Sequence, residues 1–129
     1  MILDSTAIVD LLRGNHEIIN KLRALEKTNT PIDTTSVSVF EIWKGTSAIS
    51  SKEEIDKIIY MLESISTLPL DAISAKEAGL IHARLKSTGM EVAPEDCMIA
   101  GIAKVNNETL VTRNIKHFSR INGLKIENY

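Results

Sequence analysis

The sequence predicts an α/β fold in three layers, α/β/α, with a parallel sheet in the middle. Short apolar runs, such as Met1–Leu3 and Leu110–Thr112, alternate with longer stretches whose apolar residues recur at helical spacing. Strands that alternate with helices are typical of a parallel sheet covered on both faces. Hydrophobic residues make up 43% of the 129 residues, and no repeat or linker divides the chain. We therefore expect a single domain over residues 1–129.

The first part of the chain predicts a strand followed by two helices. The apolar run Met1–Leu3 stops at Asp4, and apolar residues then recur at helical spacing until Gly14. A second amphipathic stretch, Glu17–Lys27, predicts another helix because its isoleucines and leucines form one stripe. Asp4 therefore marks a junction between a strand and a helix.

The next part predicts a strand and two further helices. Pro31 breaks the preceding helix, and Ile32–Thr35 has the composition of a short strand. The apolar positions of Val37–Trp43 predict a helix directly after it. Ser51 and Glu54 have the spacing of a capping box, so we expect a further helix to begin there.

The last part predicts two helices and two strands. Ser74 and Glu77 repeat the capping-box spacing, and Gly89 is placed to end the helix that they begin. Pro94–Asp96 suits the first turn of the next helix, because proline is tolerated there. The last predicted strands are Leu110–Thr112 and, at the edge of the sheet, Leu124–Ile126.

The composition excludes several classes of protein. The formal charge is −2, from 15 basic and 17 acidic side chains, which argues against binding polyanions by net charge alone. Aromatic residues reach only 4%, too few for a surface that stacks on bases. Cys97 is the only cysteine, which rules out an internal disulfide and a cysteine zinc cluster. No apolar run approaches the length of a membrane span, and we expect a cytoplasmic protein without a membrane partner.

Three acids and one amide are predicted to meet at one edge of the sheet. Asp4 and Asn114 each follow a predicted strand, and ligands of parallel sheets bind beyond such strand ends. Glu41 and Asp96 are expected to open helices that face the same edge. Taken singly, Asp4 also suits an N-cap and Asp96 a helix first turn. Glu41 follows Ser38 at the spacing of a capping box, so capping remains an alternative for all three acids.

A cluster of these carboxylates would require a cation. Carboxylates in one crevice repel one another and shift each other's pKa, so a fold that gathers three of them needs compensating charge. Oxygen ligands suit a hard ion such as Mg2+ or Mn2+, which keeps several waters. Such an ion activates a water and stabilises charge on phosphate oxygens. The acids therefore indicate metal-assisted hydrolysis if they meet.

Four blocks of the sequence support this interpretation together. They read ILDSTAIVDLL, SVSVFEIWKG, APEDCMIAGIAK and LVTRNIKHFSRINGLKIENY, and they span nearly the whole chain. In order and spacing they resemble the blocks of PIN-domain ribonucleases, and most closely those of VapC toxins. The resemblance implies a PIN-like fold and a Mg2+-dependent endoribonuclease, with Mn2+ as a possible substitute. It implies that Asp4, Glu41 and Asp96 bind the metal and that Asn114 joins them in catalysis.

The fourth position of the family's site departs from the usual pattern. Asn114 stands where relatives have aspartate or asparagine, and it adds no negative charge. This bears on whether a second metal ion binds, more than on the activity. Some relatives place an acid just before the phenylalanine of this block, where this sequence has His117.

Hydroxyl and basic residues lie near these acids in the sequence. Thr112 resembles the family's threonine, and we expect its hydroxyl to orient Asp96 or a water, unless it is an ordinary strand residue. Ser5 follows Asp4 and is expected to fix its carboxylate or to cap the helix. A basic segment near the last block suits a phosphate backbone, although a solvated face explains it equally well. The RNA-binding candidates are Arg113, Lys116, His117 and Arg84.

The resemblance also implies partners. These are an RNA substrate, a cognate antitoxin that crosses the active-site groove, and a second copy of the chain in a homodimer or larger homo-oligomer. Consistent with a partner surface, the helix after Ser51 is apolar on more than one face. Phe40 and Trp43 suit a core or an interface.

Three alternatives remain open at this point. A housekeeping PIN-domain nuclease that processes RNA would share the chemistry but need no antitoxin. A catalytically inactive PIN-like binding module would use the acids only as caps. A phosphoacceptor receiver domain also clusters acids around Mg2+, but it requires a lysine past a late strand, where Arg113 and Asn114 stand.

Overall fold

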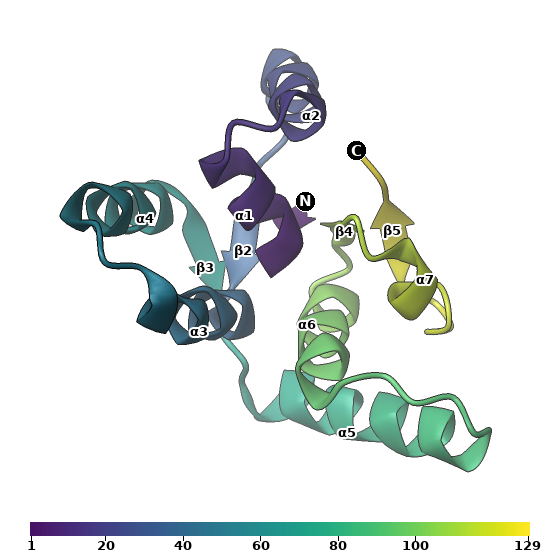
Figure 1. Cartoon of the computed structure of the whole chain (residues 1–129). Coiled ribbons are helices and arrows are strands. Elements are labelled where there is room, and N and C mark those ends of the chain that lie inside the picture. The colour runs from purple at the N-terminus through teal and green to yellow at the C-terminus, as the bar shows by residue number, and fades with distance from the viewer.

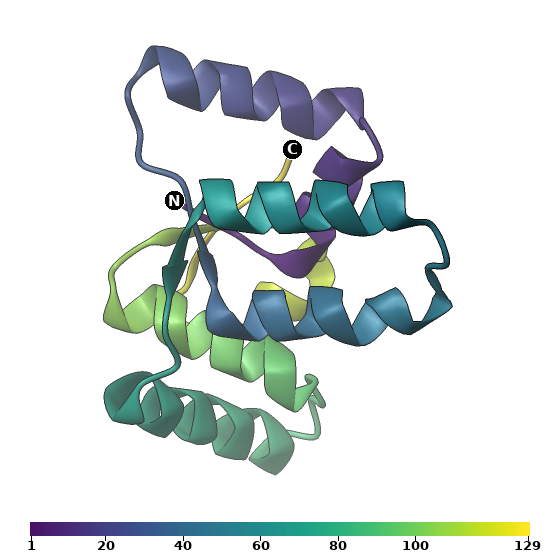
Figure 2. The same cartoon turned by 90° about the vertical axis from the view of Figure 1, so that its left-hand side faces the viewer.

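The computed structural model describes residues 1–129 and contains a five-stranded sheet between layers of helices (Figure 1). The strand order is β3-β2-β1-β4-β5, and all neighbouring strands are parallel. The predicted α/β class with a central parallel sheet is therefore confirmed. Figure 2 shows α3 and α4 side by side, with α6 next to α3 and α5 packed against α6.

The chain alternates strands and helices along most of its length. In order, the elements are β1 (Ile2–Leu3), α1 (Ser5–Leu12), α2 (His16–Lys27), β2 (Asp33–Thr35), α3 (Ser36–Gly45), a 3-10 turn η1 (Thr46–Ala48), α4 (Lys52–Ser64), β3 (Ser66–Leu68), α5 (Ala72–Ser87), α6 (Pro94–Val105), β4 (Thr109–Val111), α7 (Ile115–Phe118) and β5 (Lys125–Glu127). None of the helices combines the length and the apolar composition that crossing a bilayer requires.

Successive side chains of the central strands enter two different cores. Ile2 and Leu110 pack with residues of α5 and α6 on one face of the sheet. Leu3 and Val111 pack with residues of α1, α2 and α4 on the other face. Side chains of a strand alternate between the faces of a sheet, so both faces need apolar residues. This requirement explains why β1 and the end of β4 are apolar, whereas β2, which is also an interior strand, consists of Asp33, Thr34 and Thr35.

Two elements, β3 and α7, carry no clear sequence signal. The first two residues of β3 are exposed and polar, because β3 is an edge strand with little apolar surface to bury. The four-residue helix α7 is too short to show a helical period. The last predicted strand does lie at the other edge of the sheet, as β5, shifted by one residue from the expected Leu124–Ile126.

The capping box predicted at Ser74 is wrong. Helix α5 begins earlier, because the Oδ1 of Asp71 accepts a hydrogen bond from the Ser74 amide at 2.8 Å and makes Asp71 the N-cap. Glu77 does not reach back to the cap. It accepts a hydrogen bond from the Nζ of Lys104 on α6 at 2.6 Å, which lowers the pKa of Glu77. By contrast, Ser51 caps α4 as predicted.

Helices α5 and α6 pack closely because α6 has Gly101 at their contact. A Cβ atom on Gly101 would lie 2.6 Å from the carbonyl oxygen of Ser74 and 2.9 Å from the amide nitrogen of Ala78. Backbone atoms of α5 cannot move aside as a flexible side chain can. Since α6 also carries Asp96, this helix packing sets the position of one candidate site residue.

We expect Gly101→Ala to destabilise the protein by about 2 kcal/mol, as overpacking of a closed helix contact does. Gly79→Ala is the matched control, because a Cβ on Gly79 in α5 meets nothing within 4 Å. Alanine favours a helix over glycine by about 0.8 kcal/mol, so the control should be neutral or stabilising. Urea unfolding measures both. Equal midpoints for Gly101→Ala and the wild type would contradict the close packing.

Candidate active site

The candidate site lies at the carboxyl ends of β1 and β4, where the strand order reverses. From β1 the chain proceeds to β2 and β3 on one side, whereas β5 lies beyond β4 on the other. Asp4 and Thr112 directly follow these two strands, and the Asp4 amide donates to the Val111 carbonyl at 3.2 Å. Parallel sheets bind ligands at such a switch point.

Asp4 is both a helix cap and a member of the candidate site. Its side chain is only 2% exposed, and its Oδ1 accepts from the Ala7 amide at 2.8 Å, which makes it the N-cap of α1. The Thr6 hydroxyl donates to Oδ1 at 2.8 Å, and the Thr112 hydroxyl donates to Oδ2 at 2.5 Å. The predicted partner of Thr112 is therefore wrong: its hydroxyl orients Asp4 and not Asp96.

The prediction that Glu41 opens a helix is wrong, because Glu41 lies inside α3. The N-cap of α3 is Thr35, whose Oγ1 accepts from the Ser38 amide at 2.9 Å, so the capping-box explanation of Glu41 is wrong. The Ser5 hydroxyl donates to Glu41 Oε2 at 2.7 Å and thereby connects α1 with α3. The prediction that Ser5 fixes the carboxylate of Asp4 or caps the helix is therefore wrong: Ser5 holds the carboxylate of Glu41, and Asp4 itself caps α1 and accepts from Thr6.

Asp96 lies in the first turn of α6, beside a histidine and an asparagine. The α6 N-cap, Ala93, offers no side-chain hydrogen bond. The Nδ1 of His117 is 3.3 Å from Asp96 Oδ2 and 2.8 Å from the Asn114 side-chain nitrogen. A neutral Nδ1 accepts from the Asn114 amide, whereas a protonated Nδ1 donates to Asp96. His117 and Asn114 therefore belong to the surroundings of Asp96.

The three acids have raised pKa values, and burial is the largest cause for each. Hydrogen bonds from its hydroxyl and amide donors partly offset the raised pKa of Asp4, and the charge of Asp96 adds to it. The charges of Asp96 and Asp4 also raise the pKa of Glu41, against the hydrogen bond from Ser5. For Asp96, the contact with His117 opposes the effect of burial on the pKa. The acids thus share one electrostatic environment at the sheet edge.

The oxygen donors fit a hydrated divalent cation. No group of three acidic, histidine or cysteine side chains is close enough to ligate one ion directly, although the acids influence each other's pKa. Glu41 Oε1 and Asp96 Oδ1 accept no hydrogen bond within the protein. Mg2+ commonly binds through one or two carboxylates and keeps several waters. Since no three of these side chains can ligate one ion together, one or two acids would bind Mg2+ directly and the others through its waters.

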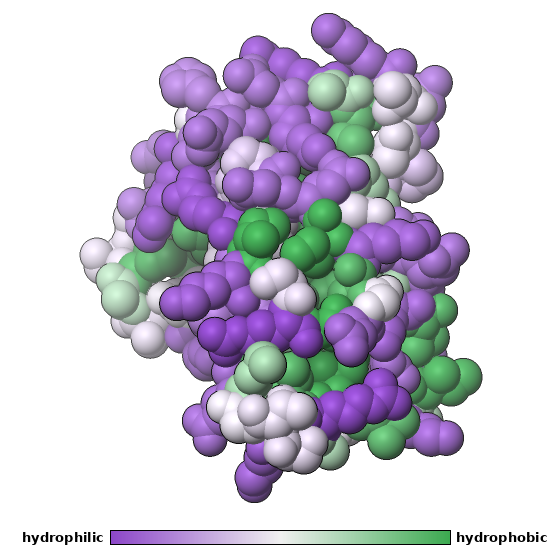
Figure 3. All heavy atoms as spheres, turned by 90° about the vertical axis from the view of Figure 1, so that its right-hand side faces the viewer, coloured by the Kyte–Doolittle hydropathy of each residue, from purple (hydrophilic) through white to green (hydrophobic).

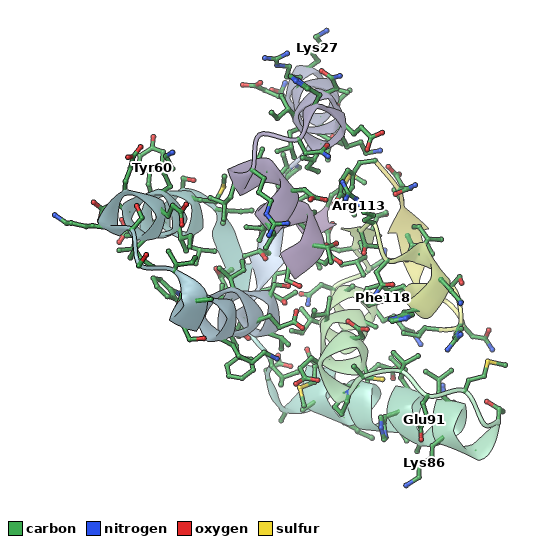
Figure 4. The ribbon with its side chains drawn as sticks, in the orientation of Figure 1. Lys27, Tyr60, Lys86, Glu91, Arg113 and Phe118 are labelled. Atoms are coloured by element: carbon green, nitrogen blue, oxygen red, sulfur yellow. The ribbon has the colours of Figure 1, made fainter.

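Of the four RNA-binding candidates, only His117 contacts one of the three site acids, Asp4, Glu41 and Asp96. His117 contacts Asp96, as described above. Arg113, labelled in Figure 4, follows the end of β4. Its Nη2 is 2.7 Å from Asp10 Oδ2. Lys116 is exposed on α7. Arg84 lies on α5, and the structure does not bring it into contact with the acids.

Sequence reasoning missed three residues next to the site, Asp10, Arg13 and Tyr129. Asp10 accepts a hydrogen bond from the Tyr129 hydroxyl at 2.6 Å. Thr6, Asp10 and Arg13 are spaced by four and three residues, which places them on one face of α1 and could have revealed the helix residues. Nothing in the sequence indicates that Tyr129 reaches α1.

The fold and the acids together define a class of protein. It is a parallel α/β domain with acidic side chains after β1, in α3 and in α6 near the switch point of its sheet. Within this class, the chain belongs to the PIN-domain family, since the PIN domain matches residues 1–124.

The similar proteins are VapC ribonucleases and complexes that contain them. The chain is 33% identical over 111 residues to "Ribonuclease VapC2" of Rickettsia felis, covering 85% of this chain and 82% of the relative. It is 34% identical over 95 residues to "tRNA(fMet)-specific endonuclease VapC" of Shigella flexneri, covering 73% and 72%. The structure of VapBC2 from Rickettsia felis bound to a promoter DNA fragment has a TM-score of 0.90 and 29% identity, covering 99% and 97%. The predicted resemblance to VapC toxins is confirmed.

We expect Glu41→Gln to raise the melting temperature near neutral pH in EDTA. Burial raises the pKa of Glu41 above 4.5, so the ionised carboxylate is less favourable in the folded than in the unfolded protein. The wild type gains stability relative to the variant as the pH falls through the raised pKa, and the difference vanishes below pH 4.5. Thermal melting across this pH range measures the effect. A lower melting temperature for the variant at neutral pH would contradict the sign.

Proposed function

We propose that the chain is a divalent-metal-dependent endoribonuclease and the toxin of a toxin–antitoxin pair. The observation that carries the proposal is that Asp4 follows β1 at the switch point of a PIN-domain sheet, while the next residue, Ser5, donates a hydrogen bond to Glu41. The charge of Asp96 raises the pKa of both acids. The acids come from distant parts of the sequence, and their charges interact. The ribonuclease names of the relatives support the same activity.

In this proposal Asp4, Glu41 and Asp96 hold Mg2+, with Mn2+ as a substitute. The bound ion would supply an activated water and offset negative charge on the phosphate oxygens. Asn114 is proposed to act at the same place, and its side-chain nitrogen lies 2.8 Å from His117 Nδ1. An asparagine in this position leaves fewer negative charges for a second ion.

Three hydroxyl groups keep the acids in place. Thr6 and Thr112 donate to the two oxygens of Asp4, and Ser5 donates to Glu41. Each donor lowers the pKa of its carboxylate, against the effect of burial, and restricts its rotation, which favours a preorganised site over a flexible one. These residues are therefore proposed as positioning residues, since none of them is expected to contact the scissile phosphate.

The proposed substrate is RNA. The basic residues Arg113, Lys116 and His117 lie after β4 or on α7, on the same side of the sheet as the acids. The upper part of the face that contains α7 and β5 is largely hydrophilic, and apolar side chains gather from its middle toward the lower right edge (Figure 3). Two relatives, from Shigella flexneri and Salmonella typhimurium, are named tRNA(fMet)-specific endonucleases, which makes tRNA(fMet) the first RNA to test.

An antitoxin is the proposed regulatory partner. Several of the similar structures are described as VapBC or toxin–antitoxin complexes. This chain has open, partly apolar grooves beside α1, one along α2 and one along α4, of about 560 and 670 Å3. Tyr60, which is 77% exposed, lines the groove along α4. An amphipathic antitoxin helix would cover such apolar side chains.

The inactive-module alternative is not favoured by the geometry. It requires the acids to act only as helix caps, but Glu41 lies inside α3 and caps nothing. A carboxylate with a raised pKa costs stability, so its presence at the switch point is better explained by a ligand. A housekeeping nuclease would differ only in lacking an antitoxin. A small gene for a DNA-binding protein next to the gene for this chain would favour the toxin over the housekeeping nuclease.

We expect Asp96→Asn to reduce Mg2+-dependent cleavage of tRNA(fMet) by about a hundredfold or more, as loss of a group at the reacting centre does. EDTA should abolish cleavage by the wild type, and added Mg2+ or Mn2+ should restore it. Glu95→Gln is the control, because Glu95 is the neighbouring acid on α6 and lies near Lys44. Gel analysis of the RNA products gives the rates. Full cleavage by purified, folded Asp96→Asn would refute the assignment.

We further propose that two copies associate through α3 and α4. Phe40 and Trp43 are 56% and 40% exposed, and Trp43 lines a groove of about 500 Å3 with Ile59 of α4. These side chains suit an interface, because the residue of α3 that packs in the core beside α5 and α6 is Val37 and not Phe40 or Trp43.

Phe40→Asp is expected to give a monomer in analytical ultracentrifugation. The exposed apolar residue Val105 serves as the control, as Val105→Asp, and an unchanged dimer in Phe40→Asp would contradict the proposed surface.

A further inference from the structure

A pocket of about 350 Å3 lies beside the acids and has two arginines in its lining. Glu41, one of the proposed metal ligands, also contributes to this lining, so the pocket opens next to the reacting centre. Its residues are Ser5, Thr6, Val9, Asp10, Arg13, Glu41, Ile42 and Arg113. The pocket therefore has one proposed metal ligand, Glu41, in its lining together with two positive charges. Arg13 comes from the end of α1, and Arg113 follows β4.

Arg113 is held by two residues that the proposed chemistry does not use. Its guanidinium lies 2.7 Å from Asp10 Oδ2, and the Tyr129 hydroxyl donates to the same oxygen at 2.6 Å. The guanidinium also lies 5.6 Å from the centre of the Tyr129 ring, within the range of a cation–π contact. The backbone amide of Arg113 donates to the Thr6 hydroxyl at 3.4 Å, close to Asp4. Both the main chain and the side chain of Arg113 are thus fixed beside α1.

The side chain of Arg113 remains available to a ligand. It is 50% exposed, whereas the carboxylate of Asp10 is 12% exposed. A guanidinium has five N–H donors, and the contact with one oxygen of Asp10 does not occupy them all. Burial and the hydrogen bond to Asp10 raise the pKa of Tyr129, so its hydroxyl stays a donor at neutral pH.

Arg13 supplies a second guanidinium to the same pocket. It is exposed at the end of α1 and forms no ion pair. Arg113 alone balances the charge of Asp10, so charge balance does not explain why Arg13 lines the same pocket. Paired guanidinium groups suit a phosphate, which accepts two parallel hydrogen bonds from each fork.

We propose that Arg113 and Arg13 bind an RNA phosphate next to the scissile one, and that Asp10 and Tyr129 position Arg113 for this contact. The inference rests on the proposed ribonuclease function and adds a direction to it. The RNA strand leaves the metal-binding acids over α1, toward the segment that carries Tyr129. Asp10 also keeps the guanidinium of Arg113 away from the acids, where it would compete with a metal cation.

The first test is RNA binding in the Asp96→Asn background, which leaves the substrate uncut. Arg113→Gln and Arg13→Gln should each weaken the binding of fluorescent tRNA(fMet) about tenfold, as loss of a charge-assisted hydrogen bond does. Each variant should also lower the slope of log Kd against log salt by about 0.7, the value for one phosphate contact on a single strand. Arg23→Gln is the matched control, because Arg23 is an exposed arginine on α2 outside this pocket.

The second test separates positioning from folding. Tyr129→Phe keeps the ring beside Arg113 but removes the hydroxyl, and Asp10→Asn removes the charge while keeping the shape. In the otherwise wild-type enzyme, both should raise KM for tRNA(fMet) several-fold with little change in kcat. Melting temperatures show whether the variants fold, and Arg113→Lys should restore part of the binding lost in Arg113→Gln.

The outcomes distinguish this inference from the function on which it rests. If the wild type cleaves RNA and the Arg113 and Arg13 variants match Arg23→Gln in Kd and salt slope, the phosphate site is overturned and the ribonuclease proposal stands. A loss confined to kcat would also overturn a neighbouring-phosphate site. If the wild type cleaves neither tRNA(fMet) nor mixed-sequence single-stranded RNA with Mg2+ or Mn2+, both proposals fail.

Discussion

The burial of Asp4 at the end of the central strand constrains the whole carboxyl edge of the sheet. Its side chain is 2% exposed and has no basic partner, so hydrogen bonds must replace the water that it loses. The donors are an amide of its own helix and the hydroxyls of Thr6 and Thr112. An ionised carboxylate without such donors costs several kcal/mol in a protein interior. Strands β1 and β4 and helix α1 are therefore held at one relative position.

Two further carboxylates, Glu41 and Asp96, lie near Asp4, and their burial costs stability. Burial raises the pKa of Glu41 and Asp96, and neither side chain has a strong ion pair with a basic residue. Packing elsewhere must offset this cost, and the close contact of α5 with α6 at Gly101 is one such source. Unfavourable electrostatics of this kind are common where a site is built to receive a cation or a substrate.

The distribution of positive charge follows the same logic. Arg113 lies only one residue beyond Thr112, near enough to the acids that its charge could neutralise them. Asp10 and Tyr129 instead hold its guanidinium at the flank of α1. His117, on α7, contacts Asp96 and Asn114. Negative charge stays central and positive charge peripheral, an arrangement that suits a bound metal ion with a polyanion around it.

Local sequence patterns indicated most of the fold, because they act over short distances. The two apolar residues of β1 and of β4 alternate between two cores, and such runs are recognisable without knowing their neighbours. Caps were less predictable where two candidates lay close together. Asp71 precedes Ser74 by three residues and takes the cap of α5, although both residue types suit that position. The short elements β3 and α7 were missed since neither contains a full period of any pattern.

The amino-acid order by itself determined the alternation of strands and helices and the residues that stand at strand ends. It also contains the family blocks that single out Asp4, Glu41 and Asp96. Only the tertiary structure decided the partners of these acids. The hydroxyl that orients Asp4 comes from Thr112, 108 positions away, and the phenol that reaches Asp10 comes from Tyr129, 119 positions away. Such contacts form because β4 pairs with β1 on one side and with β5 on the other, and no short-range pattern in a sequence encodes which distant segments will be neighbours.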